Sequence, residues 1–349
     1  MTPFGSRDTG DRMGKNRDRE ILHTHEDSIG PDRIWMARRR IASSIKPTPL
    51  IYSANLSRLL KAEVYLKPEC FQVTGSFKVR GACNVLASLS EEEKKLGLLT
   101  CSSGNHGAAL SYAASRFGNP STTVFVPSGA EETKKARILS YGAEVREEGR
   151  DFLETFGIAQ RYREETGRRY VHSHGEPLVI AGQGTIGLEI LEELPEADAV
   201  IVPVGGGGLI SGIATAVKAG KPDVRVYGVE AAAAPGAYLS FRDGCCHESV
   251  EIKPSLADGL LGTLTPLTYA ISSRLVEGIE TVEEDEIRQA MRTLFEQEQI
   301  MVEGSASVGL AAALQGKIDV SGRKVVFILT GRNVSADVFL GAVTELSGH

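Results

Sequence analysis

The sequence of 349 residues lacks any run of eighteen apolar residues, so we expect no membrane-spanning helix. A net charge of only -6, with no basic stripe beyond the amino-terminal segment, argues against a nucleic-acid surface. Residues 1–30 are polar, without the apolar core of a signal peptide, and we interpret them as a flexible extension. The length, with 42% hydrophobic and 24% charged residues, predicts a soluble globular protein of one large or two smaller domains.

Cysteine is scarce, and none of the five forms a C-x-x-C pair: they are Cys70, Cys83, Cys101, Cys245 and Cys246. An odd number in a chain of this size indicates reduced thiols and a cytoplasmic protein. The neighbours Cys245 and Cys246 could bind a soft metal or form a strained disulfide. Free thiols are the preferred interpretation, because adjacent cysteines are difficult to bridge.

Short apolar segments alternate with segments of helical periodicity along the chain. The predicted strands are residues 64–67, 98–101, 123–127, 144–146, 170–172, 199–204, 224–229 and 325–330. The predicted helices are residues 78–89, 106–117, 131–141, 152–165 and 209–219. Short buried strands that alternate with helices predict an α/β fold of parallel sheets covered on both faces.

One lysine stands at the start of a predicted helix, in the segment TGSFKVRGA at residues 74–82. The amine of Lys78 can condense with an aldehyde cofactor, whose ring Phe77 can brace, and can then act as a base at a substrate α-carbon. A lone lysine is usually a solvated charge, but the Gly-Ser-Phe-Lys-x-Arg-Gly-Ala context favours a functional role. For Arg80 we expect a structural role, as an ion pair on the domain surface.

Two further segments lie between a predicted strand and a predicted helix. The first is a glycine run suited to a phosphate, made of Gly205, Gly206, Gly207 and Gly208. It lacks the G-x-x-x-x-G-K-[ST] pattern, and a dinucleotide site would need a third glycine where Ile210 stands, although Glu230 keeps that alternative open. The second segment is residues 102–107, whose N–H groups and serine hydroxyls can bind a carboxylate, with helix capping as the structural alternative.

Together the three segments resemble the active site of the fold-type II pyridoxal-phosphate (PLP) enzymes, in the branch of threonine dehydratases, serine dehydratases and serine racemases. The resemblance extends from about residue 34 to about residue 339. It implies a tryptophan synthase β-like fold of two α/β domains, each an open, mostly parallel sheet flanked by helices. Residues 31–96 and 176–349 would form the large PLP-binding domain and residues 97–175 the small one, with PLP between them.

The resemblance also implies roles for individual residues. Lys78 would hold PLP and act as the base, and Ser103 would face the substrate from the opposite side. The other cofactor-binding residues would be Phe77, Asn105 at the ring hydroxyl, the glycines 205–208 at the phosphate, and Thr330 at the pyridine nitrogen. The implied substrate-binding residues are Ser102, Gly104, His106 and His174. Cysteine synthases have threonine at the position of His106, so this histidine favours a dehydratase.

Thr330 ends the last predicted strand, and Arg332 follows it. A neutral hydroxyl does not force protonation of the pyridine nitrogen as an aspartate would, which favours β-elimination over transamination. Arg332 departs from the Ser-Gly-Gly-Asn of the family, and its guanidinium either lies near the pyridine or points away.

Other departures concern the substrate and a metal. His174 stands where racemases carry an asparagine, and Leu261 and Gly262 replace polar residues near the substrate. These changes suggest a substrate other than serine, or neutral drift in loops. Glu230 aligns with a divalent-cation site of racemases, but Gly236 replaces the second carboxylate, so we expect no tight metal.

We therefore predict PLP-dependent β-elimination of a β-hydroxy amino acid, L-threonine or L-serine, to a 2-oxo acid and ammonia. The resemblance implies a cytoplasmic homodimer, and little sequence follows Thr330, so we expect a catabolic enzyme without an isoleucine-binding regulatory domain. The alternatives are a dehydratase of hydroxyectoine breakdown and a serine racemase. A non-catalytic PLP-binding or nucleotide-binding regulator is a further alternative, against which the intact Lys78 and Ser103 argue.

The purified protein with PLP should absorb at about 410 nm, the usual position for PLP bound to a lysine amine. Sodium borohydride should abolish the band, and Lys78→Ala should not show it. Absence of the band from the wild-type protein after addition of PLP would contradict the PLP assignment.

Overall fold

The computed structural model describes residues 29–344, so nearly all of the predicted amino-terminal extension lies outside the described residues. One sheet consists of β1 (Ile51–Tyr52), β2 (Glu63–Lys67), β7 (Ala199–Pro203), β8 (Arg225–Ala231), β9 (Gly278–Val282) and β10 (Lys324–Ile328). The other consists of β3 (Leu98–Cys101), β4 (Thr122–Val126), β5 (Glu144–Glu147) and β6 (Arg169–Tyr170).

The helices up to the middle of the chain are α2 (Pro31–Ile41), α3 (Ala54–Leu60), α4 (Lys78–Leu86), α5 (Glu91–Leu96), α6 (Asn105–Arg116), α7 (Glu132–Ser140), α8 (Phe152–Thr166) and α9 (Pro177–Glu193). They are followed by α10 (Gly208–Gly220), α11 (Gly236–Asp243), α12 (Pro266–Leu275), α13 (Glu284–Glu298), α14 (Gly304–Leu314) and α15 (Ala336–Thr344). Two short 3₁₀ helices are η1 (Glu69–Phe71) and η2 (Asp258–Leu260). Within residues 29–344, no helix is both long and apolar enough to cross a membrane.

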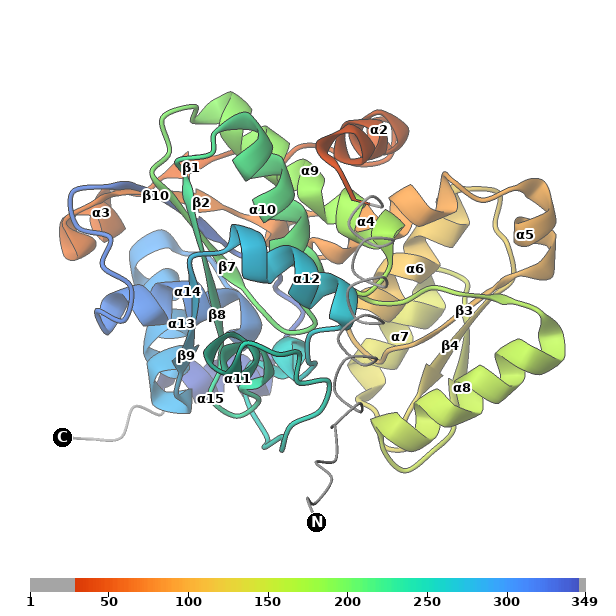
Figure 1. Cartoon of the computed structure of the whole chain (residues 1–349). Coiled ribbons are helices and arrows are strands. Elements are labelled where there is room, and N and C mark those ends of the chain that lie inside the picture. Colours follow the sequence, from red (N-terminus) through yellow and green to blue (C-terminus); the bar gives the residue numbers. More distant parts are fainter. Residues whose placement is uncertain (1–28, 345–349) are drawn as a thin grey trace, which may run out of the picture.

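The six-stranded sheet has the order β1-β2-β10-β7-β8-β9, and the four-stranded sheet has the order β5-β4-β3-β6. All neighbouring strands pair in parallel except β1 and β2. Figure 1 shows the smaller sheet with α5, α7 and α8 to the right, and the larger sheet to the left. The predicted α/β class with mostly parallel sheets is confirmed.

The predicted elements agree with the observed ones to within three residues at either end. The strand predicted at residues 98–101 has these bounds in the structure, whereas the helix predicted at residues 78–89 ends at Leu86 and the strand predicted at residues 325–330 ends at Ile328. The strand predicted at residues 170–172 ends at Tyr170. The chain turns there because Nδ1 of His172 accepts hydrogen bonds from the N–H groups of His174 (3.2 Å) and Gly175 (2.8 Å).

Strand β7 carries the core of the larger sheet, because all five of its residues are buried. Val200 and Val202 pack with Ile186 of α9 and Ile213 of α10 on one face. Ile201 belongs to the core on the other face, as expected for side chains that alternate along a strand. The apolar run that predicted this strand therefore reflects burial on both faces.

Glycines let α4, α9 and α10 approach closely. A Cβ added to Gly182 of α9 would lie 2.6 Å from the Cα of Gly81 in α4. On α10, a Cβ added to Gly212 would lie 2.6 Å from the backbone nitrogen of Gly184. Side chains at these contacts would push the helices apart. The glycines thus allow α4, which begins at Lys78, to pack closely against α9. They also allow α9 to pack closely against α10.

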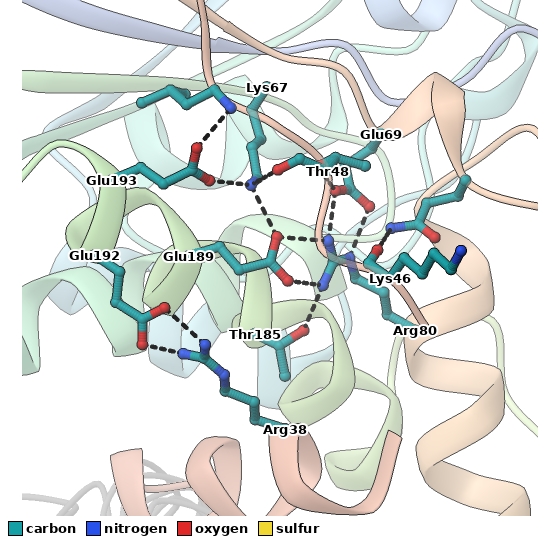
Figure 2. A network of polar contacts seen from close by, with 12 residues as sticks. Arg38, Lys46, Thr48, Lys67, Glu69, Arg80, Thr185, Glu189, Glu192 and Glu193 are labelled. Carbon is teal, nitrogen blue, oxygen red and sulfur yellow. Dashed lines mark hydrogen bonds and ion pairs between the residues drawn. The ribbon is translucent and has the colours of Figure 1, made fainter. Parts of the chain in front are cut away.

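Arg80 lies at the centre of a buried ionic network that Figure 2 shows. Its guanidinium donates to both oxygens of Glu69, each at 2.7 Å, and to those of Glu189 at 2.6 and 2.8 Å. Lys67 adds a second ion pair to Glu189, at 2.8 Å. The predicted location of Arg80 on the domain surface is wrong, since its side chain is 1% exposed. Its role is structural, because it joins α4 to η1 and α9.

Replacement of Arg80 by leucine should lower the free energy of unfolding by about 3–5 kcal/mol, because the buried Glu69 loses its ion-pair partner and Glu189 keeps only Lys67. Denaturation by urea would measure the change. Arg150→Leu is the matched control, since Arg150 is exposed and pairs only with Glu154 near the surface. Equal stability changes in the two variants would contradict the assignment.

Candidate active site

Lys78 begins helix α4 and points toward the segment that follows β6. Its Nζ donates a hydrogen bond to the carbonyl of Ser173 at 2.8 Å and lies 5.1 Å from the ring centroid of Phe77. Burial lowers the pKa of Lys78 to about 8, an effect that the carboxylate of Glu303 partly opposes. A part of the Lys78 population is therefore neutral at physiological pH and can act as a nucleophile or base.

Backbone pairing brings the end of β10 beside Lys78. Ser76 and Gly331 form an antiparallel bridge, and the N–H of Phe77 donates to the carbonyl of Thr330 at 3.1 Å. Oγ1 of Thr330 is buried and has no hydrogen-bond partner within the described residues. Such an orphaned hydroxyl suits a ligand atom such as a pyridine nitrogen.

The glycine loop at the start of α10 has no space for side chains. Gly207 has φ +80°, and a Cβ added to Gly205 would lie 2.9 Å from the Cα of Leu260. At Gly206, an added Cβ would lie 2.2 Å from Cγ of His174. The loop therefore presents backbone N–H groups at a helix start, and these donors fit a phosphate group.

Helix α6 begins at Asn105, within the predicted carboxylate-binding segment of residues 102–107. The N–H of Gly104 donates to Oγ of Ser102 at 3.3 Å, and Ser103 between them is half-buried. The side chain of Asn105 is already engaged, since its Nδ2 donates to Glu303 at 2.8 Å. Its Oδ1 accepts a short hydrogen bond of 2.5 Å from Asn333.

Glu303 is a buried carboxylate of the site that sequence reasoning missed. Besides Asn105, it accepts a hydrogen bond from the backbone N–H of Asn333 at 3.0 Å. Burial raises its pKa to about 7, although the hydrogen bond from Asn105 acts to lower it. A single glutamate before an apolar helix gives no sequence signal, because its partners are distant in the chain.

Three histidines surround the Lys78 amine. His106 is buried, with Nε2 3.1 Å from the carbonyl of Val171, and burial lowers its pKa to about 3. The rings of His172 and His174 meet edge to face at 4.5 Å. Burial lowers the pKa of His172 to about 4, with a smaller contribution from the charge of Lys78. His106 and His174 were predicted, whereas His172 was not.

The remaining predicted positions lie in other environments. Glu230 accepts hydrogen bonds from the N–H groups of Ala237 (3.0 Å) and Tyr238 (2.7 Å), so its carboxylate caps α11. Burial raises the pKa of Glu230 to about 8. Arg332 is exposed. Gly262 is near the glycine loop, since an added Cβ would lie 3.5 Å from the nitrogen of Gly206.

The cysteines all fall within the described range and are free thiols, as preferred from the sequence. In the same part of the chain, no cluster of three or more His, Cys, Asp or Glu side chains could hold a metal ion.

Comparisons with known proteins agree with this geometry. The family described as "Pyridoxal-phosphate dependent enzyme" matches residues 41–331. The L-threonine ammonia-lyase of Thermotoga maritima is 44% identical, over 86% of this chain and 75% of that protein. The catabolic L-threonine dehydratase TdcB of Escherichia coli is 40% identical, over 93% of this chain and 98% of that protein. The structure of maize serine racemase has a TM-score of 0.86 and 33% identity, over 90% of this chain and 97% of that one.

Replacement of Glu303 by glutamine should change how stability depends on pH in the cofactor-free protein. In the folded protein the pKa of the Glu303 carboxyl is about 7, whereas the pKa of a free glutamate carboxyl is 4.5. The unfolded state therefore binds fewer protons between these values, and wild-type stability falls as pH rises through them, by roughly 3 kcal/mol.

Denaturation by urea at pH 5 and pH 7 would measure this difference, which Glu303→Gln should reduce. Glu92→Gln, at an exposed position of α5, is the control and should behave like the wild type. The interpretation fails if wild type and Glu303→Gln show the same dependence on pH.

Proposed function

This chain belongs to the pyridoxal-phosphate dependent enzymes, and we propose that it eliminates water from L-threonine or L-serine, after which hydrolysis of the product gives a 2-oxo acid and ammonia. The names of the relatives, an L-threonine ammonia-lyase and a catabolic L-threonine dehydratase, support this reaction. The chain covers three quarters or more of both relatives, so the comparison concerns most of each enzyme.

The main structural support is the environment of Lys78. Its amine has a pKa of about 8, lies beside the ring of Phe77, and donates a hydrogen bond to the carbonyl of Ser173. The next residue, His174, contacts the glycine loop. An amine, a phosphate cradle and an orphaned hydroxyl at Thr330 match the three ends of PLP: aldehyde, phosphate and pyridine nitrogen. The residues present therefore fit the cofactor.

When bound, PLP supplies the aldehyde that captures the substrate amine and the ring that withdraws electrons from the α-carbon. We assign to Nζ of Lys78 the removal of the α-proton. The β-hydroxyl then leaves with a proton as water, and the enamine product tautomerises and hydrolyses to the 2-oxo acid and ammonia. The hydroxyl of Thr330 would lie at the pyridine nitrogen of the cofactor without adding a charge, which would favour elimination.

The loop before α6 would bind and orient the substrate carboxylate. Ser102, Ser103 and Gly104 lie at the helix start, where unpaired N–H groups favour an anion. Ser103 would face the α-carbon from the side opposite Lys78. The side chain of Asn105, which Glu303 orients, would contact the ring hydroxyl of PLP.

The preferred substrate depends on residues near His174. Its ring lies close to Gly206 and Gly262, and the resemblance to the family implies an asparagine at this position in racemases. A bulkier β-hydroxy or hydroxyectoine-derived substrate is the second candidate, and racemisation of serine is the third, supported by the likeness to maize serine racemase.

We also propose that the protein is a cytoplasmic homodimer, as its resemblance to the family suggests. Residues 97–175 would form the small domain and residues 31–96 and 176–349 the large one. All four strands of the smaller sheet fall between residues 98 and 170, which supports this division.

Release of 2-oxo acid tests the proposed reaction. L-Threonine, L-serine, D-serine, phenylserine and hydroxyectoine would each be incubated with the enzyme. L-Threonine or L-serine should be turned over, and Lys78→Ala should reduce the rate by at least about 10³-fold, because the residue both holds PLP and moves the proton. Lys95→Ala, at an exposed position of α5, is the matched control and should retain activity.

Activity on a bulkier substrate alone would support the second candidate. Full activity of Lys78→Ala, or no release of 2-oxo acid from any of these compounds, would contradict the proposed function.

A further inference from the structure

The side chain and the backbone of His174 both contact the glycine loop. A Cβ added to Gly206 would lie 2.2 Å from Cγ and Cδ2 of His174. A Cβ added to Gly208 would lie 2.6 Å from the carbonyl oxygen of the same histidine. His174 therefore forms one wall of the loop at the point where α10 begins.

The other residues that an added Cβ would meet first at these glycines carry no charge. Leu260, Leu264 and Thr268 are the residues nearest to Gly205 and Gly207. The start of a helix contributes about half a positive charge, whereas a phosphate monoester carries about -1.5 to -2 at pH 7. Among the described residues that come nearest to the four glycines, neither lysine nor arginine occurs, and His174 is the titratable side chain.

Three groups that can carry a positive charge face His174. They are His172, whose ring centroid is 4.5 Å away, Lys78 and His106. Burial, followed by these three groups, holds the pKa of His174 well below its usual value of 6.5. His174 is therefore neutral when no anion is bound. An anion at the loop would act in the opposite direction and favour the protonated ring.

The hydrogen bonds around the histidines leave His174 free to change its protonation. Nδ1 of His172 accepts from two backbone N–H groups, and a proton on this atom would break both bonds. Nδ1 of His174 lies 2.9 Å from Oγ of Ser173, a hydroxyl that can donate to the neutral ring or accept from the protonated one. Nε2 of His106 is directed at a backbone carbonyl, 3.1 Å away.

We propose that His174 takes up a proton when a phosphate group binds to the loop of residues 205–208, and so supplies the positive charge that the loop lacks. The inference rests on the proposed function only in that the loop binds a phosphate-bearing cofactor. His174 is then a positioning residue for the cofactor. An asparagine at this position could offer a hydrogen bond but no charge.

Calorimetric titration with 4′-deoxypyridoxine 5′-phosphate tests the inference. This probe has the phosphate and the ring of PLP but no aldehyde, so it binds without reacting with Lys78. The full-length protein, freed of cofactor with hydroxylamine, would be titrated at pH 7.5 in two buffers of different ionisation enthalpy. At this pH the phosphate of the probe is mainly a dianion, because its second pKa is about 6. The wild-type protein should take up between about 0.5 and 1 proton more than His174→Asn.

His174→Gln should behave like His174→Asn. His247→Asn is the control, because the ring of His247 pairs with Asp243, and its proton uptake should equal that of the wild type. Both His174 variants should bind the probe several-fold more weakly. If neither variant folds, the wild-type affinity alone decides: it should weaken by up to about tenfold from pH 6.5 to pH 7.5.

Equal proton uptake by the wild type and His174→Asn would overturn the inference, as would a wild-type affinity that does not change over this pH range. Failure of the wild type to bind the probe would overturn it as well. This titration does not depend on turnover. If the protein takes up the proton in the titration but releases no 2-oxo acid in the activity assay, the proposed function is contradicted and the role of His174 stands.

Discussion

Parallel pairing of strands is the constraint on which the rest of the site depends. Parallel strands end at the same edge of a sheet, so the segments that follow β7 and β10 leave the larger sheet side by side. The segments after β3 and β6 emerge together from the smaller sheet in the same manner. Each of these four ends carries side chains of the candidate site or the glycine loop. The helices α6 and α10 then start where a ligand can meet their free N–H groups.

The site contains more basic than acidic side chains, which favours the binding of an anion. Burial lowers the pKa of Lys78 and of three histidines, and the charge of Lys78 contributes to this effect at each histidine. The carboxylate of the buried Glu303 partly opposes the effect at Lys78, and burial raises the pKa of Glu303 itself. A phosphate-bearing cofactor would relieve this excess of basic groups. The ionic network around Arg80 fixes the position of α4, and therefore also that of Lys78 at the start of this helix.

Local patterns predicted much of the fold and the centre of the site. Apolar runs located β3 and β7, because strands buried on both faces need continuous apolar sequence. The half-buried edge strand β9 and the two-residue β1 gave no such signal. The burial of Arg80 could not be predicted, since its partner Glu189 lies 109 residues away along the chain. Glu303 was missed for the same reason, as its contact with Asn105 spans 198 residues.

The central claim is that Lys78 carries the cofactor, and covalent trapping tests it most directly. The protein with bound PLP would be reduced with sodium borohydride and digested, and the peptides would be analysed by mass spectrometry. We predict a phosphopyridoxyl group on the peptide that contains Lys78, at its Nζ. A label on another lysine, or no label after reduction, would contradict the account.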